Sequence, residues 1–457
     1  GDVDRLRRGL DLARATLAAA GVDEERGLLG GPWLNRLENA ERASVRESIV
    51  ALILEDAQAR VVAARAGHSE RQSRKALDAA ASRLTRLASR LSEPPSVLFR
   101  QRSRYLSALG DAEGAERDRR EAAARPPKTC RDWTALGMFH HSMGDLTAAE
   151  QALREAVALD VSSFWAWFAL GHCHYEQARF PEAVGDFTAC VVARPDFSWG
   201  HFNRGLSLTR AGRPREAVDA YSRALALDPD FQEARVNRGL VLLELNEPSR
   251  AEADLRTAVT GRCEPRVAAA LADALSRQGK TTEANELLDG LLARSPSAEL
   301  RAARGVLRLR TDPQGAAEDF RAVLTEEPKQ PLAHYGLAHV LRGHDRAAAL
   351  GHLDQALEAA PDFFDAVEMR AVERARAGDR AALDDVNRLV GVPTANGLYN
   401  AACALALLGD RARAVDLLGR SVASGFSAAH AAADLDLANL HGSPEFVRAL
   451  ERTPTAR

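Results

Sequence analysis

The chain has 457 residues, more than one hydrophobic core usually organises, so it either divides into domains or extends as an array of repeats. Hydrophobic residues make up 46% of it and aromatic residues only 5%, a composition that favours helices and argues against a large β-sandwich. The net charge of -3 provides no general attraction for polyanions, so the predicted partners are proteins or peptides and not nucleic acid.

The cysteine and hydropathy patterns indicate a reducing, cytoplasmic setting. The five cysteines are odd in number and show no paired short spacing, which predicts neither a disulfide framework nor a zinc ribbon. No apolar run approaches the roughly 20 residues that span a bilayer, and residues 1–10 are charged, so no membrane segment is expected. The missing initiator Met and the charged opening suggest an excised fragment of a longer protein, and processing or a tag scar is the alternative.

Residues 1–95 show no repeat and are expected to form a helical N-terminal subdomain. Apolar periodicity predicts helices over residues 3–20, 35–66 and 70–91, with a loop over residues 27–32. We expect this subdomain to cap the first repeat. The alternative is a linker to, or a docking surface for, a missing upstream domain.

One pattern then recurs every 34 residues. Trp133 and Gly137 return as Trp167 and Gly171, and equivalent positions continue through the next units. The spacing resembles the tetratricopeptide signature, in which W-x-x-L-G-x-x-Y precedes A-x-x-x-F and a proline. The small residues allow two helices to approach each other, and prolines such as Pro195 stop the second helix. Each unit is therefore predicted to be a helical hairpin.

The predicted fold is all-α: a tetratricopeptide-repeat superhelical solenoid of helix-turn-helix hairpins. About ten units span residues 96–426, the first and the later ones degenerate, after the N-terminal subdomain of residues 1–95. Residues 427–457 are predicted to form a C-terminal capping helix and a frayed tail.

The first helix of each unit is expected to line a concave groove. Trp165, Phe168, His172 and Tyr175 share one helical stripe, and neighbouring units repeat it, so an apolar belt is predicted in the groove. Partner binding competes here with internal cover by the N-terminal helices or with superhelix closure. The candidate peptide- or protein-binding residues are Met138, His141, Trp165, Phe168, His172, Tyr175, Trp199, Phe202, Asn203, Leu206, Val236, Asn237 and Leu240.

Asparagines occupy one equivalent position in three units, Asn203, Asn237 and Asn400. An amide there can bond both groups of a peptide backbone, and the arrangement resembles the asparagine clamp of peptide-binding tetratricopeptide proteins. Only some units carry it, and local hydrogen bonding is the alternative. The arginines that follow, Arg204 and Arg238, are expected at a solvated surface.

Histidines and a cysteine cluster between His140 and His201, but their helical positions do not converge on one point, so no metal site is predicted. The sequence contains no G-x-S-x-G, H-E-x-x-H, Walker A or dinucleotide-binding motif. We therefore expect no catalytic residue, no cofactor and no enzymatic activity from this chain.

Two stretches resemble the C-terminal tails of bacterial eukaryotic-like serine/threonine kinases of planctomycete type. They are residues 399–410, YNAACALALLGD, and residues 433–446, ADLDLANLHGSPEF. The helices near the N-terminus are similar to the linker that follows the kinase domain. The resemblance implies a substrate-docking or regulatory region downstream of a kinase domain, with the catalytic lobe outside this chain.

The sequence therefore favours a scaffold that binds a partner protein or peptide in its groove. The main alternative is a structural or oligomerisation module, in which another copy or the chain itself covers the aromatic residues. A nucleic-acid-binding solenoid would need a continuous arginine stripe inside the groove.

Overall fold

The computed structural model describes residues 15–23, 28–29, 36–66, 69–259 and 264–452. It divides into two compact units, Gly1–Ala234 and Arg235–Arg457, each considered by itself. In the described parts of the chain, no helix is both long and apolar enough to cross a membrane.

The first unit begins with a small region of mixed structure. Two short strands, β1 (Val22–Asp23) and β2 (Leu28–Leu29), pair antiparallel where the sequence predicted only helix ends and a loop. Helices α2 (Asn39–Ala66) and α3 (Glu70–Ala88) follow, close to the predicted helices. The part of the predicted first helix over residues 3–14 lies outside the described residues.

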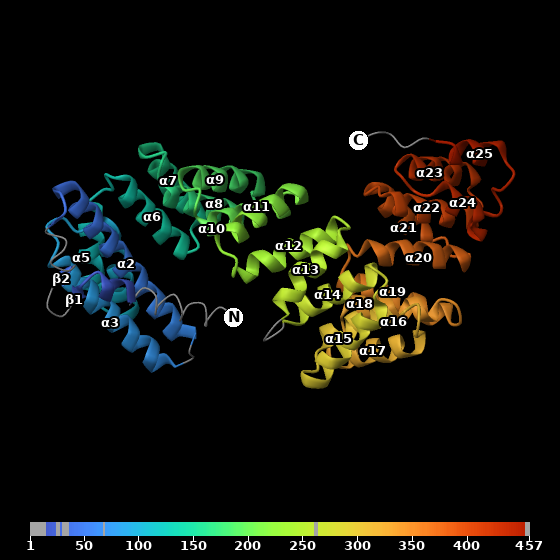
Figure 1. Ribbon diagram of the computed structural model, residues 1–457, viewed down its shortest axis with the longest axis horizontal. Helices are drawn as coiled ribbons and strands as arrows, with labels where there is room; N and C mark the ends of the chain where they lie inside the picture. Colours follow the sequence, from blue (N-terminus) through green and yellow to red (C-terminus); the bar gives the residue numbers. More distant parts are fainter. Residues whose placement is uncertain (1–14, 24–27, 30–35, 67–68, 260–263, 453–457) are drawn as a thin grey trace. The chain divides into compact units, whose positions relative to one another are not determined.

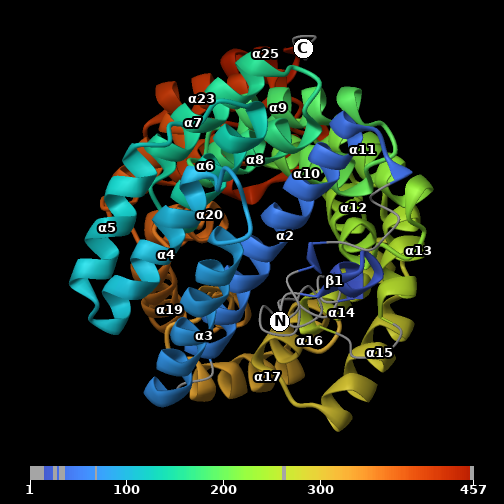
Figure 2. The ribbon, with the colours of Figure 1, turned by 90° about the vertical axis from the view of Figure 1, so that its left-hand side faces the viewer.

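Helices α2 and α3 pack on the first hairpin. Ile53 of α2 and Leu84 of α3 are buried in the same apolar cluster as Leu98 and Tyr105 from the hairpin. Figure 2 shows α2, α3 and α4 side by side at the start of the first unit. The N-terminal helices therefore cover an apolar face that a single hairpin leaves exposed.

Helical hairpins make up the rest of the first unit, and the helices of each pair contact each other along their length (Figure 1). In chain order these pairs are α4 (Ser96–Leu109) with α5 (Ala112–Ala123), α6 (Cys130–Ser142) with α7 (Leu146–Leu159), α8 (Phe164–Glu176) with α9 (Phe180–Ala193), and α10 (Ser198–Arg210) with α11 (Pro214–Leu227).

The boundary between the units falls within α12, and hairpins continue through the second unit. They are α12 (Gln232–Glu244) with α13 (Pro248–Ala258), α14 (Pro265–Arg277) with α15 (Thr281–Arg294), α16 (Ala298–Arg308) with α17 (Pro313–Glu326), α18 (Pro331–Leu341) with α19 (Arg346–Ala359), α20 (Phe364–Arg376) with α21 (Ala382–Gly391), and α22 (Ala395–Leu407) with α23 (Arg411–Ala423).

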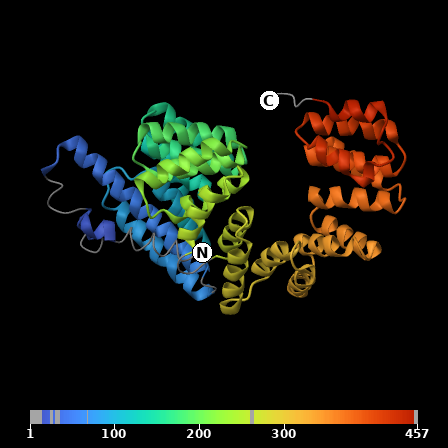
Figure 3. The same cartoon turned by 45° about the vertical axis from the view of Figure 1, so that its right-hand side comes forward.

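The end of the second unit covers its last hairpin. It consists of α24 (Ala428–Ala433), the 3-10 helix η2 (Leu435–Leu437) and α25 (Pro444–Leu450), at the red end of the ribbon in Figure 3. Leu437 and Phe446 are buried in one cluster with Leu405 and Leu418 of the hairpin. These segments thus close the apolar face that the stack would otherwise expose.

The all-α repeat fold predicted from the sequence is confirmed. Its central contact is a small residue on the first helix against a large side chain on the second. A Cβ added at Gly205 would lie 2.6 Å from Cε1 of the buried Tyr221, and one added at Gly171 would lie 2.9 Å from the ring of Phe187. The glycine therefore sets how closely the helices pack.

Every second hairpin also contains a buried ion pair that the sequence pattern did not predict. Arg102 binds Asp118 through two hydrogen bonds of 2.6 and 2.7 Å, and Arg238 binds Asp254 through two of 2.7 Å. The expectation that Arg238 lies at a solvated surface is therefore wrong. The equivalent pairs further on are Arg304 with Asp319 and Arg370 with Asp385. In the intervening hairpins the aspartate position holds Ala152, Ala220, Leu287, His352 and Leu417.

Substitution Gly205→Ala should lower the free energy of unfolding by about 1–3 kcal/mol, because the added methyl group overlaps Tyr221. Gly290→Ala, within α15 and facing open space, should raise it by about 0.5–1 kcal/mol through helix propensity. Urea unfolding followed by circular dichroism measures both. Effects of the same sign at the two sites would contradict this packing.

Substitution Asp385→Asn should lower the free energy of unfolding by about 3 kcal/mol, because Arg370 and Arg374 would lose a buried carboxylate that is only 1% exposed. Asp354→Asn is the matched control, since Asp354 binds the same two arginines but is 50% exposed. It should cost about 1 kcal/mol or less. Equal losses in urea unfolding would show that burial does not govern the pair.

Candidate functional site

A groove of about 2,320 Å³ opens within the first unit. Its walls come from α2, from the segment before α4, from the segment between α5 and α6, and from the start of α8, while α6 supplies its floor. The groove lies within the first unit, so its geometry does not depend on how the two units are arranged.

Local capping interactions fix the two repeat helices that line the groove. Thr129 and Asp132 form a capping box at the start of α6, in which each side chain accepts a hydrogen bond from the other's backbone N–H. The hydroxyl of Ser163 accepts a hydrogen bond from the Ala166 N–H at the start of α8. These caps hold the first turns of both helices at the edge of the groove.

Two of the predicted binding residues line this groove. Met138 is 37% exposed on its floor, and Trp165 is 52% exposed at its edge. The ring of Trp165 packs edge-on against Phe168 and Phe197, with centroids 5.8 and 5.7 Å away. The indole is thus supported on one side by other rings while about half of it remains open to solvent.

The opposite wall belongs to α2, for which the sequence favoured a role in capping the first repeat. Leu52, Glu55, Ala59 and Val62 line the groove at spacings of three and four residues. They form a stripe beside the buried core residues of the same helix, and this second stripe was a signal that could have identified the wall. Desolvation by the surrounding groove raises the pKa of the Glu55 carboxyl, although the residue remains exposed.

An aromatic ladder continues from this groove along the first unit. Phe197, in the turn before α10, contacts Phe168 at 5.2 Å between ring centroids. One repeat later Phe231 contacts Phe202 at 4.8 Å and Trp199 at 4.6 Å. The aromatic ring that ends one repeat therefore covers the inner helix of that same repeat.

This cover corrects the predicted exposure of two residues. Phe202 and Asn203 are each only 7% exposed, so they are core residues and not open groove residues. The Nδ2 of Asn203 donates a 2.8 Å hydrogen bond to the Trp199 carbonyl. This is the local hydrogen bonding named above as the alternative to an asparagine clamp. The Asn400 amide likewise donates to the Asn396 carbonyl at 3.0 Å and to Glu368 at 3.0 Å.

The remaining predicted residues on the ladder are partly covered, apart from Trp199, which is 45% exposed. His172 lies between the rings of Phe168 and Phe187, and burial lowers its pKa to about 4, which keeps it neutral. Tyr175 packs on Phe180. Phe168, Leu206 and His141 are half-buried and lie outside the groove lining. The Nε2 of His141 lies 3.2 Å from the Glu176 carboxylate.

The last three predicted residues, Val236, Asn237 and Leu240, lie on α12 in the second unit. All three are half-buried. The groove in the first unit is built without them.

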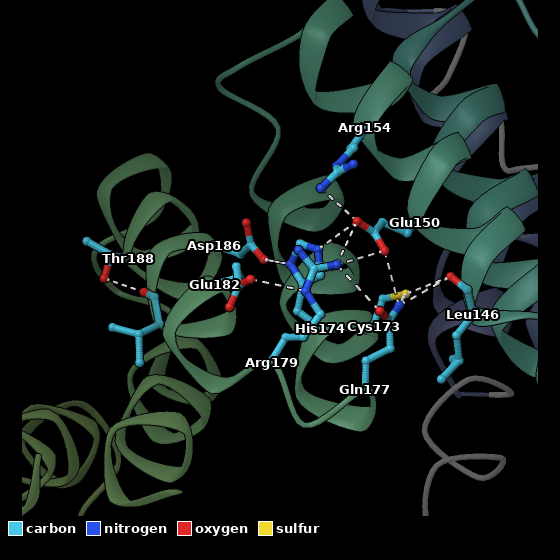
Figure 4. Close-up of polar contacts among 11 residues, drawn as sticks. Leu146, Glu150, Arg154, Cys173, His174, Gln177, Arg179, Glu182, Asp186 and Thr188 are labelled. Atoms are coloured by element: carbon cyan, nitrogen blue, oxygen red, sulfur yellow. Dashed lines mark hydrogen bonds and ion pairs between the residues drawn. The ribbon is translucent and has the colours of Figure 1, made fainter. Parts of the chain in front are cut away.

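A buried ionic cluster lies beside the ladder (Figure 4). His174 is 4% exposed, and its two ring nitrogens lie 2.5 Å from Asp186 and 3.2 Å from Glu150. The hydrogen bond with Asp186 raises the pKa of His174, and burial raises that of Asp186. Hydrogen bonds from Arg179 and His174 outweigh desolvation and lower the pKa of Glu150 to about 2. The cluster therefore joins three helices, α7, α8 and α9, through the imidazole of His174.

Three members of the group of histidines and a cysteine between His140 and His201 have partners within the protein. His174 is engaged by the two carboxylates, the Cys173 thiol donates to the Leu146 carbonyl at 3.2 Å, and His201 bonds the Pro195 carbonyl at 3.0 Å. Among the described residues, possible metal ligands converge at Cys403, Asp434 and Asp436. Asp434 there accepts the Tyr399 hydroxyl and Asp436 binds Arg376, so these carboxylates have structural partners.

The His174 cluster predicts a pH dependence of stability. Because the folded pKa of His174 is raised above its ordinary value of 6.5, its contribution is complete below pH 6.5 and is lost as the pH rises through the folded pKa. The loss should be about 1.4 kcal/mol for each unit by which the pKa is raised. Urea unfolding between pH 5.5 and 8.5 measures it, with His174→Gln as control. A parent chain and a variant with parallel pH profiles would contradict the prediction.

A family model described as tetratricopeptide repeat matches residues 134–196, 202–265 and 269–331. A search of curated proteins found no match.

Three solved structures are among those similar to this chain. A tetratricopeptide repeat protein from Parabacteroides merdae is 20% identical, covers 53% of this chain and 98% of its own, and has a TM-score of 0.48. PilW, described as a type IV pilus biogenesis factor, is 21% identical over 47% of this chain and 100% of its own, with a TM-score of 0.38. YrrB, described as having an unusual peptide-binding site, is 21% identical over 40% of this chain and 95% of its own, with a TM-score of 0.30. This chain contains tetratricopeptide repeats over the three stretches that match the family model.

Proposed function

We propose that this chain is a protein-interaction module that binds a peptide segment of a partner protein in the groove of its first unit. Tetratricopeptide repeats generally mediate contacts between proteins. The observation that carries the proposal is the half-exposed Trp165, held by neighbouring rings at the edge of a groove whose floor contains Met138. Large aromatic side chains in such positions dominate the binding energy of protein interfaces.

The size of the groove favours a chain segment over a small molecule. Its volume of about 2,320 Å³ exceeds the roughly 300–1,000 Å³ of pockets that enclose small ligands.

The chemistry of the lining indicates which peptide fits. The lining combines apolar side chains, Leu52 and Val62 on α2 and Trp165 on α8, with polar ones such as Gln58 and Ser142. Such a lining suits a segment with one or two large apolar anchors and a backbone that finds hydrogen-bonding partners.

The finer hypotheses from the sequence remain part of this proposal. The two stretches similar to kinase tails would make the chain a cytoplasmic substrate-docking or regulatory region next to a kinase domain. The competing hypothesis is self-association, in which a second copy covers the exposed side chains.

The experiment selects peptides from a displayed random library on the parent chain and measures their affinity for two variants. Met138→Ala/Trp165→Ala should weaken binding about 30-fold or more, corresponding to ~2 kcal/mol, because both anchors of the groove are removed. Val192→Ala is the matched control: Val192 is 74% exposed on α9, outside the groove lining, and its loss should leave the affinity unchanged.

Circular dichroism establishes that both variants stay folded. If the selected peptides bind the double variant as tightly as they bind the parent chain, the groove is not the binding site. Native mass measured across concentrations tests the competing hypothesis. A dimer that forms in the parent chain and disappears in the double variant would assign the same residues to self-association.

A further inference from the structure

A second, smaller pocket lies beside the groove and is lined by arginines. Its volume is about 460 Å³, and its lining includes Arg100, Arg104, Ser107, Arg119 and Phe139. Arg100, Arg104 and Ser107 project from one face of α4 at spacings of four and three residues, Arg119 comes from α5, and Phe139 comes from α6. Three elements of the first unit therefore build it.

Two of the three arginines that line this pocket, Arg100 and Arg104, differ from Arg119 and from the neighbouring Arg102 in their partners. Arg102, on the same helix, binds Asp118 through two hydrogen bonds, and Arg119 binds Glu116 at 2.8 Å. Within the described part of the chain, Arg100 and Arg104 bind no carboxylate. Arg104 makes one long contact of 3.5 Å to the Gln58 amide oxygen, and the buried Nε of Arg100 has no hydrogen-bonding partner.

We propose that this pocket binds a phosphorylated serine or threonine side chain of the peptide that occupies the groove. A phosphate monoester carries about -1.5 to -2 charges at neutral pH and offers three acceptor oxygens. It therefore balances the two guanidinium groups of Arg100 and Arg104 that lack carboxylate partners, whereas a single carboxylate would leave one positive charge uncompensated. The Ser107 hydroxyl and the face of Phe139 complete the lining.

The position of the pocket links it to the groove. Phe139 lines both, so a segment anchored at Met138 can place a neighbouring residue against the arginines. That a peptide brings the phosphate rests on the proposed function, but the pocket is present in the chain without a bound peptide. Binding of the phosphate group alone can therefore be measured separately.

His140, which follows Phe139, provides a local reporter. Burial lowers the pKa of His140, and the positive charge of Arg100 lowers it further. An anion bound to Arg100 would offset that charge, so the pKa of His140 should rise when phosphate binds.

The test titrates the full chain with inorganic phosphate, O-phosphoserine and, as the carboxylate comparison, glutamate, while NMR follows His140. We expect both phosphates to bind and to raise the pKa of His140, and glutamate to bind about tenfold more weakly. Arg100→Gln/Arg104→Gln should weaken phosphate binding about tenfold or more. Arg117→Gln is the matched control, because Arg117 is an exposed α5 arginine outside the pocket and should change affinity less than twofold.

Equal phosphate affinity in the parent and the double variant would overturn the inference, as would an unchanged pKa of His140 at saturating phosphate. Glutamate binding as tightly as phosphoserine would also overturn it in favour of an acidic side chain. If the double variant loses its helical signal, Arg104→Gln alone replaces it with the same expected direction. Met138→Ala/Trp165→Ala should still bind phosphate, so failure of the peptide groove and failure of this pocket give different results.

Discussion

The close contact between the two helices of each hairpin is the constraint on which the rest of the structure depends. A small residue such as Gly171 or Gly205 lies against a large side chain, Phe187 or Tyr221, and fixes the distance between the helices. A hairpin packed in this way still has an uncovered apolar face, so neighbours must stack and the ends must be capped. In the first unit α2 contributes to the cap, because one stripe of its side chains enters the core. The next stripe of the same helix forms a wall of the groove.

Charge is distributed according to the same geometry. In the first, fifth, seventh and ninth hairpins an arginine and an aspartate neutralise each other inside the hairpin, as Arg238 and Asp254 do, and in the third hairpin His174 lies 2.5 Å from Asp186. In the part of the chain that the structure describes, Arg100 and Arg104 bind no carboxylate, and they share a pocket with an aromatic ring that also lines the groove. Uncompensated charge next to apolar surface is a combination suited to recognising a charged and partly apolar peptide.

The two stretches that resemble kinase tails form one structural unit in the fold. Tyr399, from the first stretch, stacks on Phe426 with ring centroids 3.9 Å apart, and its hydroxyl donates to Asp434 of the second stretch. The Asn439 amide donates to the Ala406 carbonyl at 2.6 Å. Their occurrence together in one sequence is therefore explained by the packing of the last hairpin and its cap. Any kinase association has to be established independently of this contact.

The sequence by itself determined the all-helical hairpins and the small residues at their contacts, because a 34-residue period reports interactions between helices that are adjacent in the chain. Met138 and Trp165, which the sequence predicted as binding residues, line the groove. Only the tertiary structure decided that Phe202 and Asn203 are buried, since Phe231 from the following turn covers Phe202. It likewise decided that α2 forms a wall of the groove and that particular arginines are paired. Those outcomes depend on which faces meet between elements distant in sequence, and periodicity carries no information about such contacts.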